Sequence, residues 1–294
     1  MKPGRLHRLF TAWAWTATLV LVTAMAIILG FLISRGWHSL TPSLIFGETP
    51  AWEAVTLVRP VFDGLFPALA GTLALVLTAV ALAVPLGIGA GIFLAEYCPP
   101  KPKAFFSLVF DILAGIPSIV VGLFGFSLTI LLHQLFGGRI YPCLLISAIS
   151  LAFLVLPYII RTTQLSLQGL DPAARLPALG LGATKFQNIV HVLVPASFSH
   201  ILSGVILAVG RCAEDTAVIM LTGAVAAAGI PKSLFSGYEA LPFYIYYISS
   251  QYADDAELAR GYGACLLLLA LCLTLFGLAR WLQRRVSQRI LYRP

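Results

Sequence analysis

The sequence has little charge. Only 11% of its 294 residues are Asp, Glu, Lys or Arg, whereas 59% are hydrophobic. A soluble domain carries about 25% charged residues, so this chain has too little charge to cover a globular surface. The shortage excludes an ordinary soluble enzyme, a disordered protein and a nucleic-acid-binding protein, although the net charge is +7. The basic residues lie in short clusters between long apolar runs, which is typical of an integral membrane protein.

Motifs for catalysis and metal binding are also scarce. The five cysteines show neither a CxxC pair nor metal-ligand spacing, and His191 and His200 have no ligand partners at useful spacing. We therefore expect no metal site, no cofactor and no catalytic residue. The phosphate-cradling pattern GxxxxGK[ST] occurs nowhere in the sequence, so the chain itself is not expected to hydrolyse ATP.

Six apolar runs predict six transmembrane helices. A bilayer core about 30 Å thick needs roughly 20 apolar helical residues, and runs of this length suit helices rather than the strands of an outer-membrane barrel. The predicted fold class is therefore an all-α integral membrane protein. The runs cover residues 9–34, 66–95, 104–132, 140–160, 198–228 and 261–279.

Lys and Arg are unevenly distributed between the two sides. With a cytoplasmic N-terminus, the inside segments hold thirteen of them and the outside segments five. Because cytoplasmic loops carry the excess of Lys and Arg, we predict that both termini are cytoplasmic. The inside set is Lys2, Arg5, Arg8, Lys101, Lys103, Arg161, Arg175, Lys185, Arg280, Arg284, Arg285, Arg289 and Arg293, and the outside set is Arg35, Arg59, Arg139, Lys232 and Arg260.

A charged cluster interrupts the fifth apolar run. Arg211, Glu214 and Asp215 fall in its middle, where a charge costs at least about 2.5–3.5 kcal/mol and therefore usually faces protein or water. The acids follow Arg211 by three and four residues, so either reaches it on one helical face. The guanidinium suits an oxyanion, and we expect a substrate pathway at these residues and Thr216. The alternative is a self-neutralising group that only fastens helices together.

The longest inside segment, residues 161–197, predicts a pair of short helices beneath the bundle. Asp171 before Pro172 is typical of an N-cap with proline at the first helical position, and Pro177 is expected to end or kink that helix. A second stretch, residues 184–194, is amphipathic. Its apolar positions are expected on one side: Phe186, Ile189, Val190 and Leu193. Such a pair of helices offers a docking surface for a soluble partner.

This segment resembles the EAA loop of ABC-importer membrane subunits. That loop reads Glu-Ala-Ala, three residues, Gly, about nine residues and a hydrophobic-x-Leu-Pro ending. Gly182 matches the central glycine, and Val-Leu-Val-Pro at 192–195 matches the ending. Counting back from the glycine, Leu176 and Pro177 replace the motif's glutamate and first alanine, and only its second alanine remains, at Ala178.

Four further segments follow in order: PALAGTLALVLTAVALAVPLGIGAGIFLAEY (67–97), DILAGIPSIVVGLFGF (111–126), LPYIIRTT (156–163) and GRCAEDTA (210–217). Together with the loop, they resemble the phosphate ABC-importer permease family over residues 67–285. The GIPSIVVGLF, RTT and LPFYIYY pieces are more similar to its A-type than to its C-type subunit. The family's Arg-x-x-Gly-Glu-Thr is here Arg-Cys-Ala-Glu-Asp-Thr, so Asp215 replaces the glutamate and Glu214 the glycine.

The resemblance implies a type I ABC importer permease in a bacterial inner membrane. Residues 1–65 are then an N-terminal tail, first transmembrane helix and outer loop, 66–285 the permease core with its coupling loop 161–197, and 286–294 a tail. The residues implied in contact with the ATPase are Arg175, Ala178, Gly182, Lys185 and Phe186.

The same resemblance implies the partners and the reaction. The partners are a second permease subunit, two cytoplasmic ATPase subunits and an extracytoplasmic phosphate-binding protein, with membrane lipid around the helices and no nucleic acid. The chain forms half of a pathway that works by alternating access. Other functions stay open: a permease for sulfate, molybdate or phosphonate, a channel, or a membrane-embedded enzyme. An enzyme needs charged clusters on several spans, and only one span has such a cluster.

Overall fold

The computed structural model describes residues 5–56, residue 61 and residues 63–291. Within this part the regular structure is helical, apart from one isolated bridge between Ala224 and Tyr238. Six helical segments are long and apolar enough to cross a membrane: Leu9–Ser39, Phe66–Tyr97, Ser118–Leu135, Leu144–Gln168, Lys185–Glu214 and Asp255–Gln288. The prediction of an all-α protein with six transmembrane helices is confirmed.

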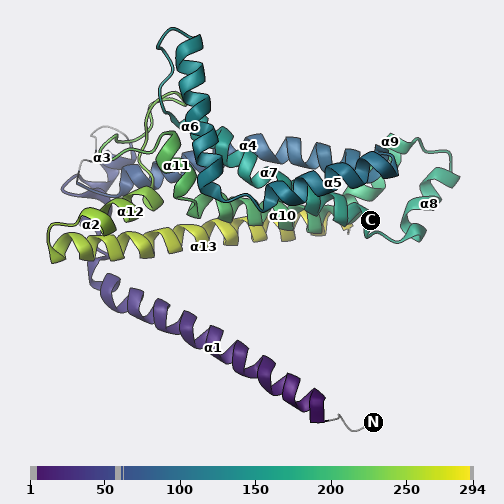
Figure 1. Cartoon of the computed structure of the whole chain (residues 1–294), viewed down its shortest axis with the longest axis horizontal. Coiled ribbons are helices and arrows are strands. Elements are labelled where there is room, and N and C mark those ends of the chain that lie inside the picture. The colour runs from purple at the N-terminus through teal and green to yellow at the C-terminus, as the bar shows by residue number, and fades with distance from the viewer. Residues whose placement is uncertain (1–4, 57–60, 62, 292–294) are drawn as a thin grey trace.

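The helices follow one another with few long connections (Figure 1). They are α1 (Arg5–Gly36), α2 (Pro42–Phe46), α3 (Ala51–Val55), α4 (Phe66–Ile92), α5 (Pro100–Ala114), α6 (Ser118–Leu135), α7 (Leu144–Gln168), α8 (Pro172–Gly180), α9 (Lys185–Asn188), α10 (Val194–Glu214), α11 (Ala217–Thr222), α12 (Leu241–Gln251) and α13 (Asp255–Leu291). A 3-10 turn, η1 (Trp37–Ser39), follows α1. Two π-helical turns, η2 (Phe93–Tyr97) and η3 (Ile189–Leu193), extend α4 and join α9 to α10.

The centre of the bundle is α7. In its most apolar window 67% of the residues are buried, against 17–28% for the four other spans of the bundle. Its neighbour α4 packs closely through two glycines, because a Cβ on Gly91 would lie 2.5 Å from Thr163 Cβ and one on Gly87 would lie 2.7 Å from the side chain of Ile159. The Gly87/Gly91 spacing therefore serves helix packing, as expected for small residues four apart.

The first span, α1, lies mostly outside the bundle (Figure 1). None of its most apolar window is buried. It meets α13 only near its C-terminal end, where the ring of Phe31 packs edge-on against Tyr262, with centroids 5.8 Å apart, and Gly36 lies against Leu266. Most of the apolar surface of α1 is consequently left to lipid or to another protein.

The predicted span over 104–132 is corrected. The structure divides this run into α5 and α6 at Gly115–Pro117, and α6 turns away from the direction of α5 (Figure 1). Pro117 stands just before α6 with φ −58° and ψ 136°. Proline has no backbone N–H and disfavours helical conformation at the residue before it, so Ile116 and Pro117 separate two helices.

The predicted fifth span, 198–228, is also corrected. Its helix begins earlier, at Lys185, and ends at Glu214, so the charged cluster lies at the end of a helix rather than inside one. Asp215 is extended, with φ −74° and ψ 119°, and the short helix α11 follows. Gly223 then packs against the backbone of Cys143, next to the N-terminus of α7. The apolar run is therefore two helices with a break at Asp215–Thr216.

The close approach of α4 and α7 gives a prediction about stability. Gly91→Val places a branched side chain against Thr163 and the Ile160 carbonyl, so we expect a loss of about 1–3 kcal/mol through overpacking. Gly89→Val on the same helix is the control, because no atom lies within 4 Å of its Cβ position. Thermal unfolding of the purified protein in detergent measures both. Equal melting temperatures for the two variants would contradict the packing role of Gly91.

Candidate functional site

The loop between α7 and α10 forms one end of the molecule, where α8 and α9 project from the bundle (Figure 1). Asp171 caps α8 by accepting the Ala173 N–H at 2.8 Å. Helix α9 begins with a capping box, in which Thr184 N donates to Gln187 Oε1 at 2.8 Å and Gln187 N to Thr184 Oγ1 at 3.3 Å. Caps of this kind satisfy backbone donors at helix starts, and they give the loop a defined shape.

The turn between α8 and α9 depends on Gly182. Its φ is +88°, in the left-handed region, and its Cβ position is empty of neighbours within 4 Å. Glycine is therefore favoured at this position because of its left-handed backbone conformation, not because a side chain would clash with a neighbour. We expected Pro177 to end or kink the helix; helix α8 continues through Pro177 to Gly180, so it does not end there. A proline inside a helix removes one backbone hydrogen bond, and the residues on both sides of Pro177 stay helical.

Large apolar side chains cover the outer side of the loop. Leu181 is 90% exposed and Phe186 is 67% exposed. We call the whole set the apolar loop surface: Leu176, Leu179, Leu181, Phe186 and Val190. Exposed apolar side chains gathered in one loop are typical of an interaction site.

The expectation that the apolar residues of 184–194 share one side is wrong. Phe186 and Val190, four residues apart, are exposed, whereas Ile189 and Leu193, also four apart, are buried. The stretch runs through the π-helical turn η3 and packs one apolar row onto Leu167 and its neighbours. The second row, which includes Phe186, is exposed.

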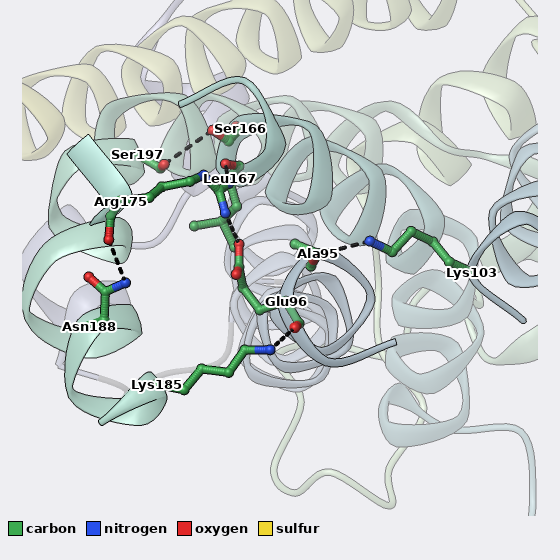
Figure 2. A network of polar contacts seen from close by, with 9 residues as sticks. All are labelled: Ala95, Glu96, Lys103, Ser166, Leu167, Arg175, Lys185, Asn188 and Ser197. Carbon is green, nitrogen blue, oxygen red and sulfur yellow. Dashed lines mark hydrogen bonds and ion pairs between the residues drawn. The ribbon is translucent and has the colours of Figure 1, made fainter. Parts of the chain in front are cut away.

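Arg175 extends from α8 toward Leu167 and Glu96 (Figure 2). Its Nη1 lies 2.7 Å from Glu96 Oε1, and its Nη2 donates to the carbonyl of Leu167. The Arg175 carbonyl in turn accepts a hydrogen bond from Asn188 Nδ2 at 3.2 Å. Arg175 thus ties α8 to the ends of α7 and η2 through its side chain, and to α9 through its carbonyl.

Lys185 makes a second tie to the same place (Figure 2). Its Nζ donates to the Glu96 carbonyl and lies 4.8 Å from the centre of the Tyr97 ring. Lys103 similarly donates to the Ala95 carbonyl at 3.1 Å. Cationic side chains suit the free carbonyls at the C-terminal end of a helix. Both lysines therefore stabilise the end of the α4–η2 helix, where the loop rests on it.

The predicted coupling residues therefore have different places. Phe186 is on the apolar loop surface, and Gly182 forms the turn. Arg175 and Lys185 instead hold the loop against the bundle. Ala178 is half-buried in α8, and its carbonyl accepts the Ala183 N–H at 3.0 Å.

Glu96 was not among the residues predicted from the sequence. It follows directly after the second apolar run, 66–95, and a carboxylate in that place is a signal for a basic partner at the same end of the bundle. Its Arg175 partner is 79 residues further along the chain.

The charged cluster lies at the break between α10 and α11. Arg211 Nη1 is 3.6 Å from Glu214 Oε1, and Nη2 is 3.7 Å from Asp215 Oδ2. Asp215 is 2% exposed at its side chain, while Arg211 is 39% and Glu214 61% exposed. The second oxygen of Asp215, Oδ1, accepts the Val218 N–H at 2.9 Å and caps α11. The three charges thus come together as predicted, and Thr216 lies next to Asp215 as the N-cap residue of α11.

The depth of the cluster follows from the neighbours of α10. Gly204 packs against Thr162 of α7, and Gly210 against Phe276, which lies in the charge-free run 261–279 of α13. Arg211 therefore lies beside apolar stretches of both helices. Charges at such a depth avoid hydrocarbon, so the exposed face of α10 that carries Arg211 and Glu214 needs water or another protein beside it.

The opposite end of the molecule contains a hollow of about 700 Å³. The segment before α4, the segment 225–240 and α12 line it, together with Arg260 of α13. The carboxylate of Glu239 in its wall accepts the Gly229 N–H at 2.7 Å, and burial raises the pKa of this carboxyl above its usual value. The hollow is polar enough for a hydrated loop or a side chain from a docked partner.

The family described as "Binding-protein-dependent transport system inner membrane component" matches residues 87–288, more than half of the chain. This chain belongs to that family. It is therefore a multi-pass inner membrane protein and a component of a transport system that depends on a binding protein. A permease of this family is not itself a catalyst.

Two relatives and one solved structure support the assignment. The chain is 31% identical over 281 residues to "Phosphate transport system permease protein PstA 1" of Mycobacterium tuberculosis (strain CDC 1551 / Oshkosh), covering 95% of this chain and 88% of that protein. It is 33% identical over 251 residues to "Phosphate transport system permease protein PstA" of Haemophilus influenzae, covering 85% and 84%. The fold is similar to a chain of a bacterial alginate ABC transporter bound to its periplasmic protein, with a TM-score of 0.66, 16% identity and coverage of 96% and 97%. The predicted ABC importer permease architecture is confirmed.

The Glu96–Arg175 pair gives a prediction about the loop. Glu96→Gln keeps the size of the side chain and removes the charge that holds Arg175, so we expect amide exchange in α8 to become at least about ten-fold faster. Hydrogen–deuterium exchange of the assembled transporter measures it. The control is Asp111→Asn, which breaks the 2.8 Å pair with Arg161 between α5 and α7. If both variants exchange alike in α8, Glu96 does not hold the loop.

Proposed function

We propose that this chain is a transmembrane subunit of an ATP-driven phosphate importer and forms half of its translocation pathway. Support comes from the two relatives, whose names describe phosphate permeases, and from the charged cluster on α10. The observation that carries the proposal is Arg211, a partly exposed guanidinium beside apolar stretches of α7 and α13. Phosphate is an oxyanion that fits the planar fork of an arginine.

Glu214 and Asp215 explain how an anion binds there without being trapped. Their oxygens are 3.6 and 3.7 Å from Arg211, longer than the 2.7–2.9 Å of a strong charge-assisted hydrogen bond. The guanidinium therefore keeps donors for a substrate oxygen. The two carboxylates repel the same anion, so it binds weakly enough to move on, as conduction through a membrane requires.

A second permease subunit completes the pathway in this proposal. The exposed face of α10 with Arg211 and Glu214 needs water or protein, and a related subunit placed opposite it provides both a wall and a water-filled path. The mostly uncovered α1 supplies further apolar surface for the same contact. Mid-membrane sites between two related halves are common in transporters.

Two ATPase subunits, one beneath each permease, supply the energy by hydrolysing ATP. The apolar loop surface is the docking site on this chain, and Arg175 and Lys185 carry motion of the loop to α4 and α7 through Glu96. Closure of the ATPase pair then rocks the helices from one access state to the other. Leu176 lies on this surface in place of the acidic residue of related loops, so the contact here is more apolar.

An extracytoplasmic phosphate-binding protein delivers the anion at the end opposite the loop, where the 700 Å³ hollow opens beside Glu239. The orientation in a bacterial inner membrane follows from the excess of Lys and Arg on the loop side, which places both termini in the cytoplasm. In this arrangement residues 1–65 are a peripheral segment, 66–285 the permease core and 286–294 a tail.

Arg211 provides the main test. Arg211→Gln removes the charge that attracts the anion, and we expect phosphate uptake into proteoliposomes of the complete transporter to fall at least about a hundred-fold while assembly is kept. The control is Arg139→Gln, an exposed arginine near the opposite end of the molecule, which should transport normally. Unchanged uptake by the Arg211 variant would refute the pathway role.

The apolar loop surface provides a second test. The double substitution Leu181→Ala and Phe186→Ala removes its two most exposed side chains, and we expect co-purification of the ATPase subunits to fall about ten-fold or more as buried apolar area is lost. Phe136→Ala is the matched control, because Phe136 is similarly exposed just after α6. ATPase retention equal to that of the control would place the docking surface elsewhere.

A further inference from the structure

A second hollow of about 510 Å³ lies between α10 and α13, at the end of the bundle that carries the loop. We call it the α10–α13 hollow. Its walls include Ser203 and Leu207 from α10, and Phe276, Arg280 and Arg284 from α13. Gln283 also lines the hollow, and its Nε2 donates to the Ser199 carbonyl at 2.8 Å and to Ser203 Oγ at 3.3 Å. This side chain therefore joins α10 and α13 beside the hollow.

The hollow shares a face of α10 with the charged cluster. Ser203, Leu207 and Arg211 follow one another at intervals of four residues, so they lie along one side of the helix. Ser203 is eight residues from Arg211, about 12 Å along the helix axis, and Leu207 is four residues from it, about 6 Å. Leu207, the lining residue nearer to Arg211, is exposed. An anion leaving Arg211 toward the loop end therefore meets this hollow next.

Arg280 and Arg284 give the hollow a positive charge that no acid balances. Arg280 and Arg284 are one helical turn apart on the side of α13 that lines the hollow. Among residues 5–56, 61 and 63–291, neither forms an ion pair with an acid, unlike Arg161, Arg175 and Arg211. Two guanidinium groups on adjacent turns offer several donors to one tetrahedral oxyanion. Exposure to water weakens this attraction, so the site can release its ligand.

We propose that the α10–α13 hollow is a release-side binding site for the transported oxyanion, with Arg280 and Arg284 as its ligands. This inference rests on the proposed pathway past Arg211. The anion passes from a cluster with two acids, which limits its affinity, to a cluster without acids. A phosphate group of an anionic phospholipid has the same chemistry, but the face that holds the hollow also holds the mid-span charges, which hydrocarbon disfavours.

The test measures binding of labelled inorganic phosphate to the assembled transporter in phosphatidylcholine nanodiscs, without binding protein. All chains also carry Arg211→Gln, so that the mid-span cluster does not contribute. We expect the double substitution Arg280→Gln and Arg284→Gln to weaken binding at least about ten-fold. Arg285→Gln is the matched control, since that guanidinium lies over the Trp281 ring, 4.4 Å from its centre, and it should bind as its parent does.

A second variant protects the test against misfolding. Ser203→Trp fills the hollow and keeps both arginines, and it should weaken phosphate binding to a similar extent. Unchanged binding in either variant, or no phosphate binding in the Arg211→Gln parent, overturns the proposal. Native mass spectrometry separates the two sources of the phosphate group: an anionic phospholipid that the double variant loses, with free phosphate binding unaffected, makes the hollow a lipid site and overturns the release role.

Failure of this inference differs from failure of the proposed function. If proteoliposomes take up phosphate but substitution of Arg280 and Arg284 leaves phosphate binding unchanged, only the proposal of a release-side site is wrong. If sulfate binds the hollow with the same dependence on both arginines while phosphate does not bind, the hollow stands as an oxyanion site and the proposed substrate is wrong.

Discussion

The packing of other helices against α7 is the constraint on which the remaining structure depends. Helices in lipid gain little from burying apolar side chains, because lipid is equally apolar, so they associate through close van der Waals contact. Gly87 and Gly91 allow α4 to reach α7, and Gly204 does the same for α10 at Thr162. These contacts fix the relative heights of three helices. The depth of Arg211 and the position of the loop both follow from those heights.

The two candidate sites are linked through the same helices. Glu96 is at the end of the α4–η2 helix and receives both Arg175 and Lys185, while α10 begins where the loop ends and finishes at the Arg211 cluster. In the proposed mechanism, a displacement of the loop reaches the cluster by two routes, directly along α10 and indirectly through α4 and α7. Rigid helices with a few polar ties transmit such motion without large changes inside either helix.

Much of this arrangement was predictable from the sequence, and the failures have physical reasons. Long apolar runs predicted the six spans because the bilayer sets their length. The interval from Arg211 to Asp215 predicted their contact because it is local to one helix. The break at Pro117 was missed because a proline in an apolar run is compatible with a kink, and distant packing decides the outcome. Glu96 was missed because a pair separated by 79 residues has no local periodicity.

The attachment of α1 has a mechanical consequence. Helix α1 has 32 residues, so it is about 48 Å long, and it meets the bundle near its C-terminal end, around Phe31 and Gly36 (Figure 1). It therefore acts as a lever with its fulcrum at one end. A rotation of about 10° at the fulcrum moves the far tip by roughly 8 Å along an arm of this length. A partner that binds the N-terminal end of α1 therefore sets the tilt of this helix, and the bundle need not rearrange.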